Sequence, residues 1–195
     1  KDLNGDGIID TNDRTMIGRG LPIMTGGFTN NFEYKGFDLS VFFQWSYGND
    51  VLNANRLFFD SFPKESELNQ YASYTNRWTP ENPNSDIPAA TNSSSNLVIS
   101  SRVVEDASFL RLKTVTLANR TKNFPEEDKI DNARLYVAAQ NLWTITGYSG
   151  YDPEVSIRSG GLTPGLDFSS YPRALSVSFG INLGFNPIKA LKYNM

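Results

Sequence analysis

The chain has 195 residues, the size of one domain or of part of a larger one. Its net charge of -3, without any cluster of lysine and arginine, argues against a nucleic-acid partner. Cysteine and histidine are both absent, which excludes disulfides, zinc sites built from these residues, thiol nucleophiles and histidine-based triads. No apolar run reaches the roughly 18 residues of a transmembrane helix. Because the chain starts at Lys1 without a signal peptide, we expect it to be part of a longer protein.

Residues 2–13 have the spacing of a calcium-binding loop, with Gly7 where such a loop turns sharply. The predicted ligands are Asp2, Asn4, Asp6, the carbonyl of Ile8, Asp10 and Asp13. Asp13 is shorter than the glutamate usual at the last position. The alternative is an Asx-rich turn in which the same side chains bind their own backbone. Calcium as a structural cofactor is therefore a prediction from spacing alone.

Residues 26–47 are predicted to form a hairpin of two long strands joined at Lys35 and Gly36. In both strands, apolar and aromatic residues alternate with polar ones, and aromatic residues gather near the strand ends, as in membrane interface girdles. A hairpin on a soluble core is the alternative. Residues 48–106 show no sustained period and are predicted to be a long extracellular loop.

The second predicted hairpin spans residues 107–146. In its first strand, Leu110 and Leu112 fall on the opposite face from Val115 and Leu117. A β-bulge, or a strand beginning that stands above the bilayer, would reconcile the two pairs. The second strand, 133–145, alternates cleanly except at Asn141. Residues 147–171 form a second predicted extracellular loop, 172–185 the final strand and 186–195 a tail.

The final strand, within Tyr171–Phe185, decides the predicted class. Six apolar residues, from Leu175 to Phe185, alternate with small or polar ones, which suits a wall between hydrocarbon and water. About five strands with alternating short and long connections predict an all-β fold: antiparallel strands of a large transmembrane β-barrel with long extracellular loops. Five strands cannot close such a barrel, so others must belong to it.

Aromatic residues in the two long loops are candidate substrate-binding residues, because they can stack on a ligand or pin the loop to itself. They are Tyr71, Tyr74, Trp78, Tyr148 and Tyr151.

Five motifs in order resemble the C-terminal third of SusC/RagA-type TonB-linked outer-membrane transporters of Bacteroidetes. They are DLNGDGIIDTNDR, YKGFDLSVFFQWSYGND, EDASFLRLKTVTL, LYVAAQNLWTITGYSGYDPEV and YPRALSVSFGINLGF. The resemblance implies a barrel of about 22 strands, an N-terminal plug that contacts TonB, and a SusD-like surface lipoprotein over the barrel mouth. It implies uptake of oligosaccharides or peptides and no covalent chemistry. Family members usually end on the aromatic residue that matches Phe185.

Two other hypotheses remain at this stage. One is a dockerin-like calcium module, although only one calcium-type repeat is present and strands follow it. The other is a secreted calcium-binding β-sandwich that binds or cleaves glycans. Cleavage would need a pair of carboxylates, and Glu33 and Asp38 are the nearest candidates. Their predicted place at the rim of a barrel accounts for these two acidic residues equally well.

Overall fold

A computed structural model describes residues 2–8, 10–61, 69–90, 98–121, 130–157 and 163–185. The chain divides into two compact units, each considered by itself. The loop unit comprises Lys1–Met24, Tyr47–Ser108 and Gly147–Pro172, and the long-sheet unit comprises Thr25–Ser46, Phe109–Thr146 and Arg173–Met195. In the described ranges, no helix is long and apolar enough to span a bilayer. The predicted tail 186–195 lies outside the described residues.

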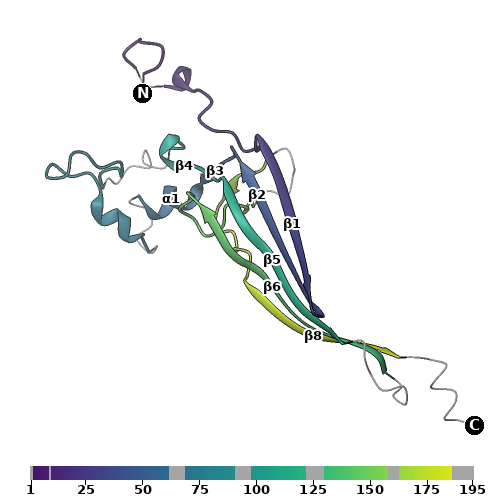
Figure 1. The fold of residues 1–195 in the computed structure, drawn as a ribbon. Coiled ribbons are helices and arrows are strands. Elements are labelled where there is room, and N and C mark those ends of the chain that lie inside the picture. The colour runs from purple at the N-terminus through teal and green to yellow at the C-terminus, as the bar shows by residue number, and fades with distance from the viewer. Residues whose placement is uncertain are drawn as a thin grey trace, which may run out of the picture. The chain divides into compact units, whose positions relative to one another are not determined.

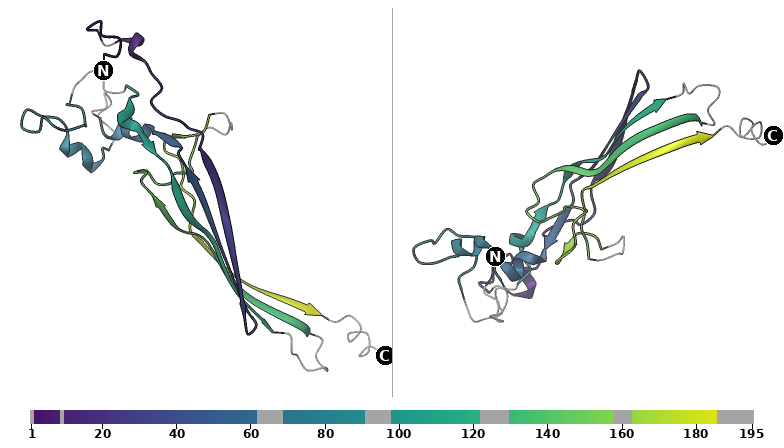
Figure 2. Two further views of the ribbon diagram at one scale, coloured as in Figure 1. Left: turned by 45° about the horizontal axis from the view of Figure 1, so that its top comes forward. Right: turned by 90° about the horizontal axis from the view of Figure 1, so that it is seen from below.

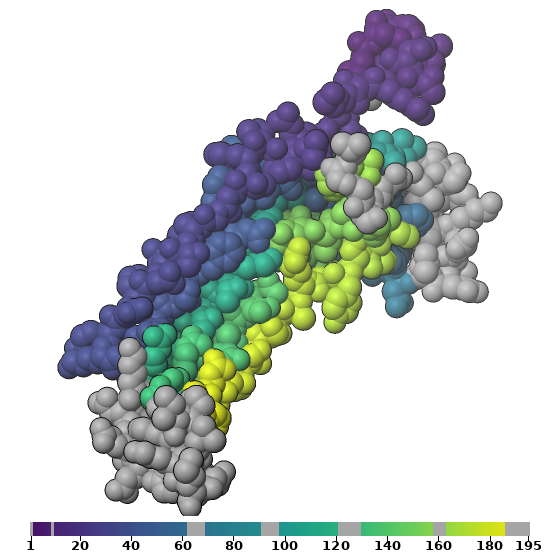
Figure 3. Space-filling view, turned by 90° about the vertical axis from the view of Figure 1, so that its right-hand side faces the viewer, coloured from purple at the N-terminus to yellow at the C-terminus, as the bar shows by residue number. Residues whose placement is uncertain are grey.

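The long-sheet unit is one antiparallel sheet with the strand order β1-β2-β5-β6-β8 (Figure 1). Its strands are β1 Met24–Tyr34, β2 Phe37–Tyr47, β5 Phe109–Thr121, β6 Ile130–Thr146 and β8 Ser176–Phe185. The further views show the same strands side by side, and the space-filling view shows them as adjacent bands (Figures 2 and 3). The prediction of five antiparallel strands is confirmed.

The connection between β1 and β2 is as tight as predicted. Lys35 and Gly36 are its two central residues, with φ of 48° and 86°. Positive φ at both positions is the geometry of a type I′ turn, whose twist matches that of the flanking strands. Glycine adopts this conformation without strain, which explains its place at the second position.

The strand register places the apolar residues of each strand beside the apolar residues of its neighbours. One row across four strands contains Leu39, Leu117, Val137 and Phe179, and another contains Val41, Val115, Ala139 and Val177. The row between them, on the opposite face, contains Ser40, Thr116, Ala138 and Ser178. The sheet therefore has an apolar face and a face of small and polar residues, named the polar face below.

A bulge reconciles the two halves of β5, which confirms the prediction. The register of β5 shifts between Leu112 and Thr114 against both neighbouring strands, so both ladders step past Lys113. Leu112 thereby returns to the face of Val115. On β6, Asn141 and Leu142 lie opposite this bulge, and Asn141 has a left-handed φ of 53°. The apparent break at Asn141 in the alternation is therefore part of the bulge.

The final strand is shorter than predicted. Its ladder begins at Ser176, paired with Gln140, so residues 172–175 and the apolar Leu175 lie outside it. The bulge explains the shortening, because Asn141 follows Gln140 on β6 and interrupts the pairing. The Asn141 Nδ2 instead donates a hydrogen bond to the carbonyl oxygen of Ala174, at 3.0 Å.

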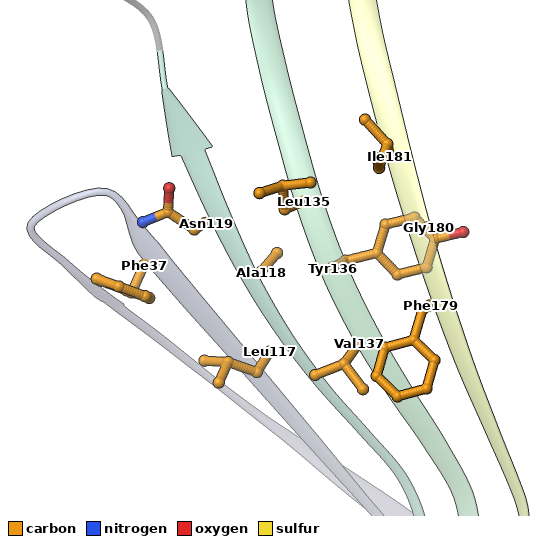
Figure 4. A pocket seen from close by; sticks show the side chains of 10 residues that line it. All are labelled: Phe37, Leu117, Ala118, Asn119, Leu135, Tyr136, Val137, Phe179, Gly180 and Ile181. Carbon is orange, nitrogen blue, oxygen red and sulfur yellow. The ribbon is translucent and has the colours of Figure 1, made fainter.

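A shallow hollow of about 710 Å³ lies on the long sheet (Figure 4). Its lining is mostly apolar and includes Leu117, Leu135, Val137, Phe179 and Ile181. On the polar face, the ring of Tyr136 lies over Gly180, in the space that a larger side chain would occupy. The hollow offers few polar groups to orient a soluble ligand, which directs the search for a site to the loop unit.

The loop unit contains a small sheet with the order β4-β3-β7, formed by β3 Asp50–Asn53, β4 Val104–Asp106 and β7 Leu166–Asp167. β3 pairs antiparallel with β4 and parallel with β7. The six-residue helix α1, Ala54–Phe59, follows β3, and 3-10 turns lie at Thr11–Asp13, Ala72–Asn76 and Ser101–Val103. The segment 48–106, predicted as a loop, thus contains short elements that are too brief to show a period. Val51, Ala107 and Tyr148 form one buried cluster, and Ala54, Leu57 and Val103 form another.

Candidate ligand-binding site

Two neighbouring cavities lie within the loop unit. The first, of about 460 Å³, is lined by Asn53, Arg56, Asp60, Tyr71, Ser73, Ser149, Gly150 and Tyr151. The second, of about 430 Å³, is lined by Asn55, Phe59, Asn69, Gln70, Tyr71, Tyr151, Ser169, Ser170, Tyr171 and Pro172. Both volumes lie in the range of small-molecule sites. Tyr71 and Tyr151 line both cavities and therefore mark the border between them.

Arg56 and Asp60 bring charge to the first cavity. They lie one helical turn apart in and just after α1, and the Arg56 Nε donates to Asp60 Oδ2 at 3.0 Å. The Arg56 Nη1 also donates to Glu105 Oε1 at 3.2 Å and to the Arg102 carbonyl oxygen at 3.1 Å. A six-residue helix is not stable alone, so these contacts hold α1 in place. Asp60 also accepts a hydrogen bond from the Ser73 hydroxyl.

Glu105 joins three segments beside this cavity. Its Oε1 accepts hydrogen bonds from Asn53 Nδ2 at 3.1 Å and from the Ser149 hydroxyl at 2.9 Å, and its Oε2 accepts one from the Ser149 amide at 2.9 Å. Burial alone would raise the pKa of Glu105, but these bonds and the one from Arg56 outweigh it, and the pKa is lowered. For Arg56, burial opposes the charge, but the bonds to Asp60 and Glu105 prevail and raise the pKa. Both groups stay ionised, and the charge of Arg56 is neutralised inside the protein.

Tyr71 and Tyr151 supply the aromatic surface of the site. The Tyr71 amide donates to the Phe59 carbonyl oxygen at 2.9 Å, and the two rings pack at a tilt with centroids 5.3 Å apart. Burial, followed by the nearby Tyr151 and Asp60, raises the pKa of Tyr71, so its phenol is neutral at physiological pH. Tyr151 is 80% exposed, which leaves its ring open to a ligand.

The other three aromatic candidates lie apart from these cavity linings. Tyr148 is 5% exposed, and its hydroxyl donates to Asp167 Oδ2 at 2.6 Å. Burial and this bond raise the pKa of Tyr148, whose environment is that of a core residue. Tyr74 is buried beneath the Arg77 guanidinium, 5.3 Å from its ring centroid. Trp78 is 42% exposed, and its amide donates to the Ile87 carbonyl oxygen at 2.8 Å.

Sequence reasoning missed the polar residues of the first cavity, above all Asn53, Arg56 and Ser149. Only the Arg56 and Asp60 pair carried a local signal, the four-residue spacing of a helical ion pair. The others come together through long-range pairing, which no period in the sequence reveals.

The predicted calcium loop binds its own backbone in the described residues. Asp2 accepts hydrogen bonds from the amides of Gly5 at 2.6 Å and Gly7 at 2.9 Å. Asp13 accepts from the amides of Leu3 at 2.7 Å and Asp10 at 2.8 Å. Backbone hydrogen bonds, chiefly from Gly7 to Asp2 and from Leu3 to Asp13, lower the pKa of both carboxyls.

This arrangement is that of the Asx-rich alternative. Among the described residues, no three acidic side chains converge closely enough to hold a metal ion. A carboxylate oxygen that accepts one hydrogen bond keeps a second lone pair, so Asp2 and Asp13 retain capacity for a cation. Calcium binding by this loop stays a prediction.

Known proteins are similar to this chain in sequence and in fold. Over 190 residues the chain is 38% identical to TonB-dependent receptor P3 of Formosa agariphila, covering 94% of this chain and 18% of the receptor. Over 186 residues it is 28% identical to TonB-dependent receptor SusC of Bacteroides thetaiotaomicron, covering 94% of this chain and 17% of SusC. Among solved structures, the RagAB peptide transporter matches 82% of this chain and 17% of its own chain, with a TM-score of 0.70 and 32% identity. The chain belongs to the SusC/RagA-type TonB-dependent receptors.

The RagAB peptide importer in its 'closed-closed' state also resembles this SusC/RagA-type chain, with a TM-score of 0.73 and 28% identity over 91% of this chain and 20% of that one. The chain spans less than a fifth of the length of two Formosa receptors that it matches, TonB-dependent receptors P3 and P26, at 18% and 19%. No protein-family model matches it. Membership of this receptor family argues against the secreted β-sandwich and the dockerin-like module considered above.

Proposed function

We propose that this chain is part of an outer-membrane TonB-dependent importer and supplies five strands of its barrel wall. The observation that carries the proposal is the register, which aligns apolar rows across four strands on one face of the long sheet only. Such a sheet suits lipid on one side and water on the other. Because unpaired edges are costly in lipid, β1 and β8 must pair with further strands of the same barrel.

The lengths of the connections between strands support an orientation for the proposed barrel. Bacterial barrels have short turns in the periplasm and long loops outside. We therefore assign the Lys35 and Gly36 turn and the β5–β6 connection to the periplasm, and the loop unit to the cell surface. The chain's last residues would then be periplasmic.

The proposed transport cycle uses partners outside this chain. A SusD-like surface lipoprotein would close over the barrel mouth, and TonB would act through a plug. The cargo would be an oligosaccharide or a peptide, held by aromatic and hydrogen-bonding groups of the loop unit. The relatives are receptors and transporters by name, and the proposal includes no covalent step. Residues 2–13 would bind calcium and rigidify one surface loop.

Fractionation of the source organism tests this proposal. An antibody to residues 147–157 should detect the full-length gene product in the outer membrane, well above the 21.8 kDa of this chain, and a surface lipoprotein should co-purify with it. A soluble protein of about the size of this chain would refute the importer.

A further inference from the structure

The hollow on the long sheet has apolar walls and a floor of backbone (Figure 4). Its walls are two neighbouring rows of the apolar face, with Leu117, Val137 and Phe179 in one row and Phe37, Leu135 and Ile181 in the other. The residues between these rows, such as Ala118, belong to the polar face, so only their backbone lies between the walls. The rows are two residues apart along each strand, about 7 Å, and the hollow therefore runs across the strands as a groove.

The walls stay open although the strands that carry them are paired. Leu117 on β5 and Leu135 on β6 are 43% and 54% exposed, and both strands have a neighbour on each side. The next row of the apolar face, which contains Val115 and Val177, has shorter side chains and does not line the hollow. The hollow is thus a shaped part of an otherwise smoother apolar face.

A positive charge lies on the same face beside the hollow. Phe28 stacks on Phe43 with ring centroids 4.8 Å apart, which places the alternate residues of β1 from Phe28 to Tyr34 on the apolar face. The Lys35 ammonium lies 5.2 Å from the centroid of the Tyr34 ring, so the turn carries its charge on that face. Phe37, in the wall of the hollow, follows Lys35 by two residues, at most about 7 Å of chain.

The acidic residues that flank this turn lie on the opposite face. Glu33 and Asp38 are out of phase with Tyr34 and Phe37, which places both carboxylates on the polar face. There Asp38 accepts a hydrogen bond from the Arg120 guanidinium at 3.4 Å. A negative group that approaches along the apolar face would therefore meet Lys35 before it meets these carboxylates.

Asn119 marks the end of the hollow nearest the turn. It lines the hollow and is the cross-strand partner of Phe37, the first residue of β2. An amide is costly to place in hydrocarbon, and lysine and tyrosine favour the membrane interface. Asn119, Lys35 and Tyr34 thus agree on the level at which hydrocarbon gives way to lipid headgroups.

We propose that the hollow binds one acyl chain of a phospholipid of the periplasmic leaflet, with the phosphate of that lipid at Lys35. The chain matches the apolar walls, and the phosphate matches the ammonium. This inference rests on the proposed function, in which the apolar face meets lipid and the Lys35 turn is periplasmic. It distinguishes one seated lipid from the bulk lipid around the rest of the barrel.

Photolabelling of the purified full-length receptor in detergent tests the inference. The probe is a phosphatidylglycerol with a diazirine in one acyl chain, and mass spectrometry maps the labelled peptides. Labelling at Leu135 and Val137 should saturate at a probe concentration about tenfold lower than labelling at Val177, which lies on the same face outside the hollow. Unlabelled phosphatidylglycerol should displace the probe. Diacylglycerol with the same chains, which lacks the phosphate, should need about fivefold more, and lipid A, a lipid of the outer leaflet, should not compete.

Two variants separate the headgroup from the chain. Lys35→Gln should raise the half-saturating probe concentration about fivefold, because one cation near a membrane surface contributes about that factor. Its control is Arg19→Gln, which removes an exposed positive charge from the loop unit and should leave labelling within about twofold of wild type. Val137→Trp should abolish saturable labelling at Leu135, because the larger side chain fills the hollow. Val177→Trp, on the same face but outside the hollow, is the matched control and should label as wild type does.

Three results would overturn the inference. Labelling in the hollow does not saturate before labelling at Val177, or both Lys35→Gln and Val137→Trp label as wild type does, or diacylglycerol or lipid A displaces the probe as readily as phosphatidylglycerol. Each of these results leaves the importer untouched if the receptor fractionates with the outer membrane. A soluble receptor would reject the importer and the lipid site together.

Discussion

Replacement of Arg56 by methionine should loosen the wall of the first cavity. The variant removes the guanidinium that bonds the side chains of Asp60 and Glu105 and the Arg102 carbonyl oxygen. The Asp60 side chain is 3% exposed, so its charge would remain buried, with a hydrogen bond from the Ser73 hydroxyl. Removing one partner of a buried pair costs 3–5 kcal/mol, and because the Arg56 side chain is 23% exposed we expect the lower end, about 3 kcal/mol.

Hydrogen exchange of the full-length receptor in detergent measures this loss. A cost of about 3 kcal/mol would increase local opening roughly 150-fold, so amides in peptides that cover α1 and β4 should exchange faster by about that factor. Arg19→Met is the matched control, because Arg19 is an exposed arginine of the same unit, and its exchange should match wild type. Exchange of α1 and β4 that stays within twofold of wild type in Arg56→Met would refute the role of Arg56 in holding them.

Three further predictions concern other parts of the chain. The pKa of Glu105 is lowered from its ordinary 4.5, so the carboxylate stabilises the folded state above pH 4.5, and this stabilisation is lost as the pH falls below that value. Amide hydrogen exchange of β4 should therefore accelerate as the pH falls below 4.5, and it should accelerate less in Glu105→Gln, which has no carboxylate to protonate. Gly180→Val should destabilise the barrel by about 1–3 kcal/mol, because the valine side chain would overlap the Tyr136 ring. Adding Tyr136→Ala should restore much of the midpoint of urea unfolding. If Gly180→Val alone leaves that midpoint unchanged, the contact between residue 180 and the Tyr136 ring is rejected. Asp2→Ala and Asp13→Ala should each abolish calcium binding to the full-length receptor, measured by calorimetry, whereas Asp38→Ala should not; retained binding in both variants would assign the ion to another site.

The long sheet was predictable because its signal is local. In each strand, apolar and polar residues alternate with a period of two, and a sheet with one apolar face requires this period. The bulge in β5 also left a trace, since the apolar residues of Leu110–Leu117 change parity part-way. The start of β8 left no trace in the sequence of β8 itself, because its pairing is interrupted by the bulge on the neighbouring strand β6.

The candidate site was predictable only in part. Tyr71 and Tyr151, predicted because aromatic residues in long loops can contact ligands, line the two cavities. Tyr148, predicted on the same ground, is a core residue. The small sheet joins Leu52 to Leu166, 114 positions later, through a strand of two residues. Contacts of such separation have no periodic signal, so the polar wall around Asn53 and Arg56 emerges only in three dimensions.

Alternate exposure along β8 is the most direct test of the barrel wall. Because the chain contains no cysteine, single cysteines can be introduced at each position of Ser176–Phe185 in the full-length receptor, in outer-membrane vesicles permeable to small solutes. A water-soluble maleimide should label the cysteines at 176, 178 and 182, whereas those at 177, 179, 181, 183 and 185 should react only after detergent extraction. Positions 180 and 184 are left out of the comparison, because a side chain there would meet Tyr136 and Asn132. Equal labelling of both sets in intact vesicles would contradict a strand with lipid on one face and water on the other.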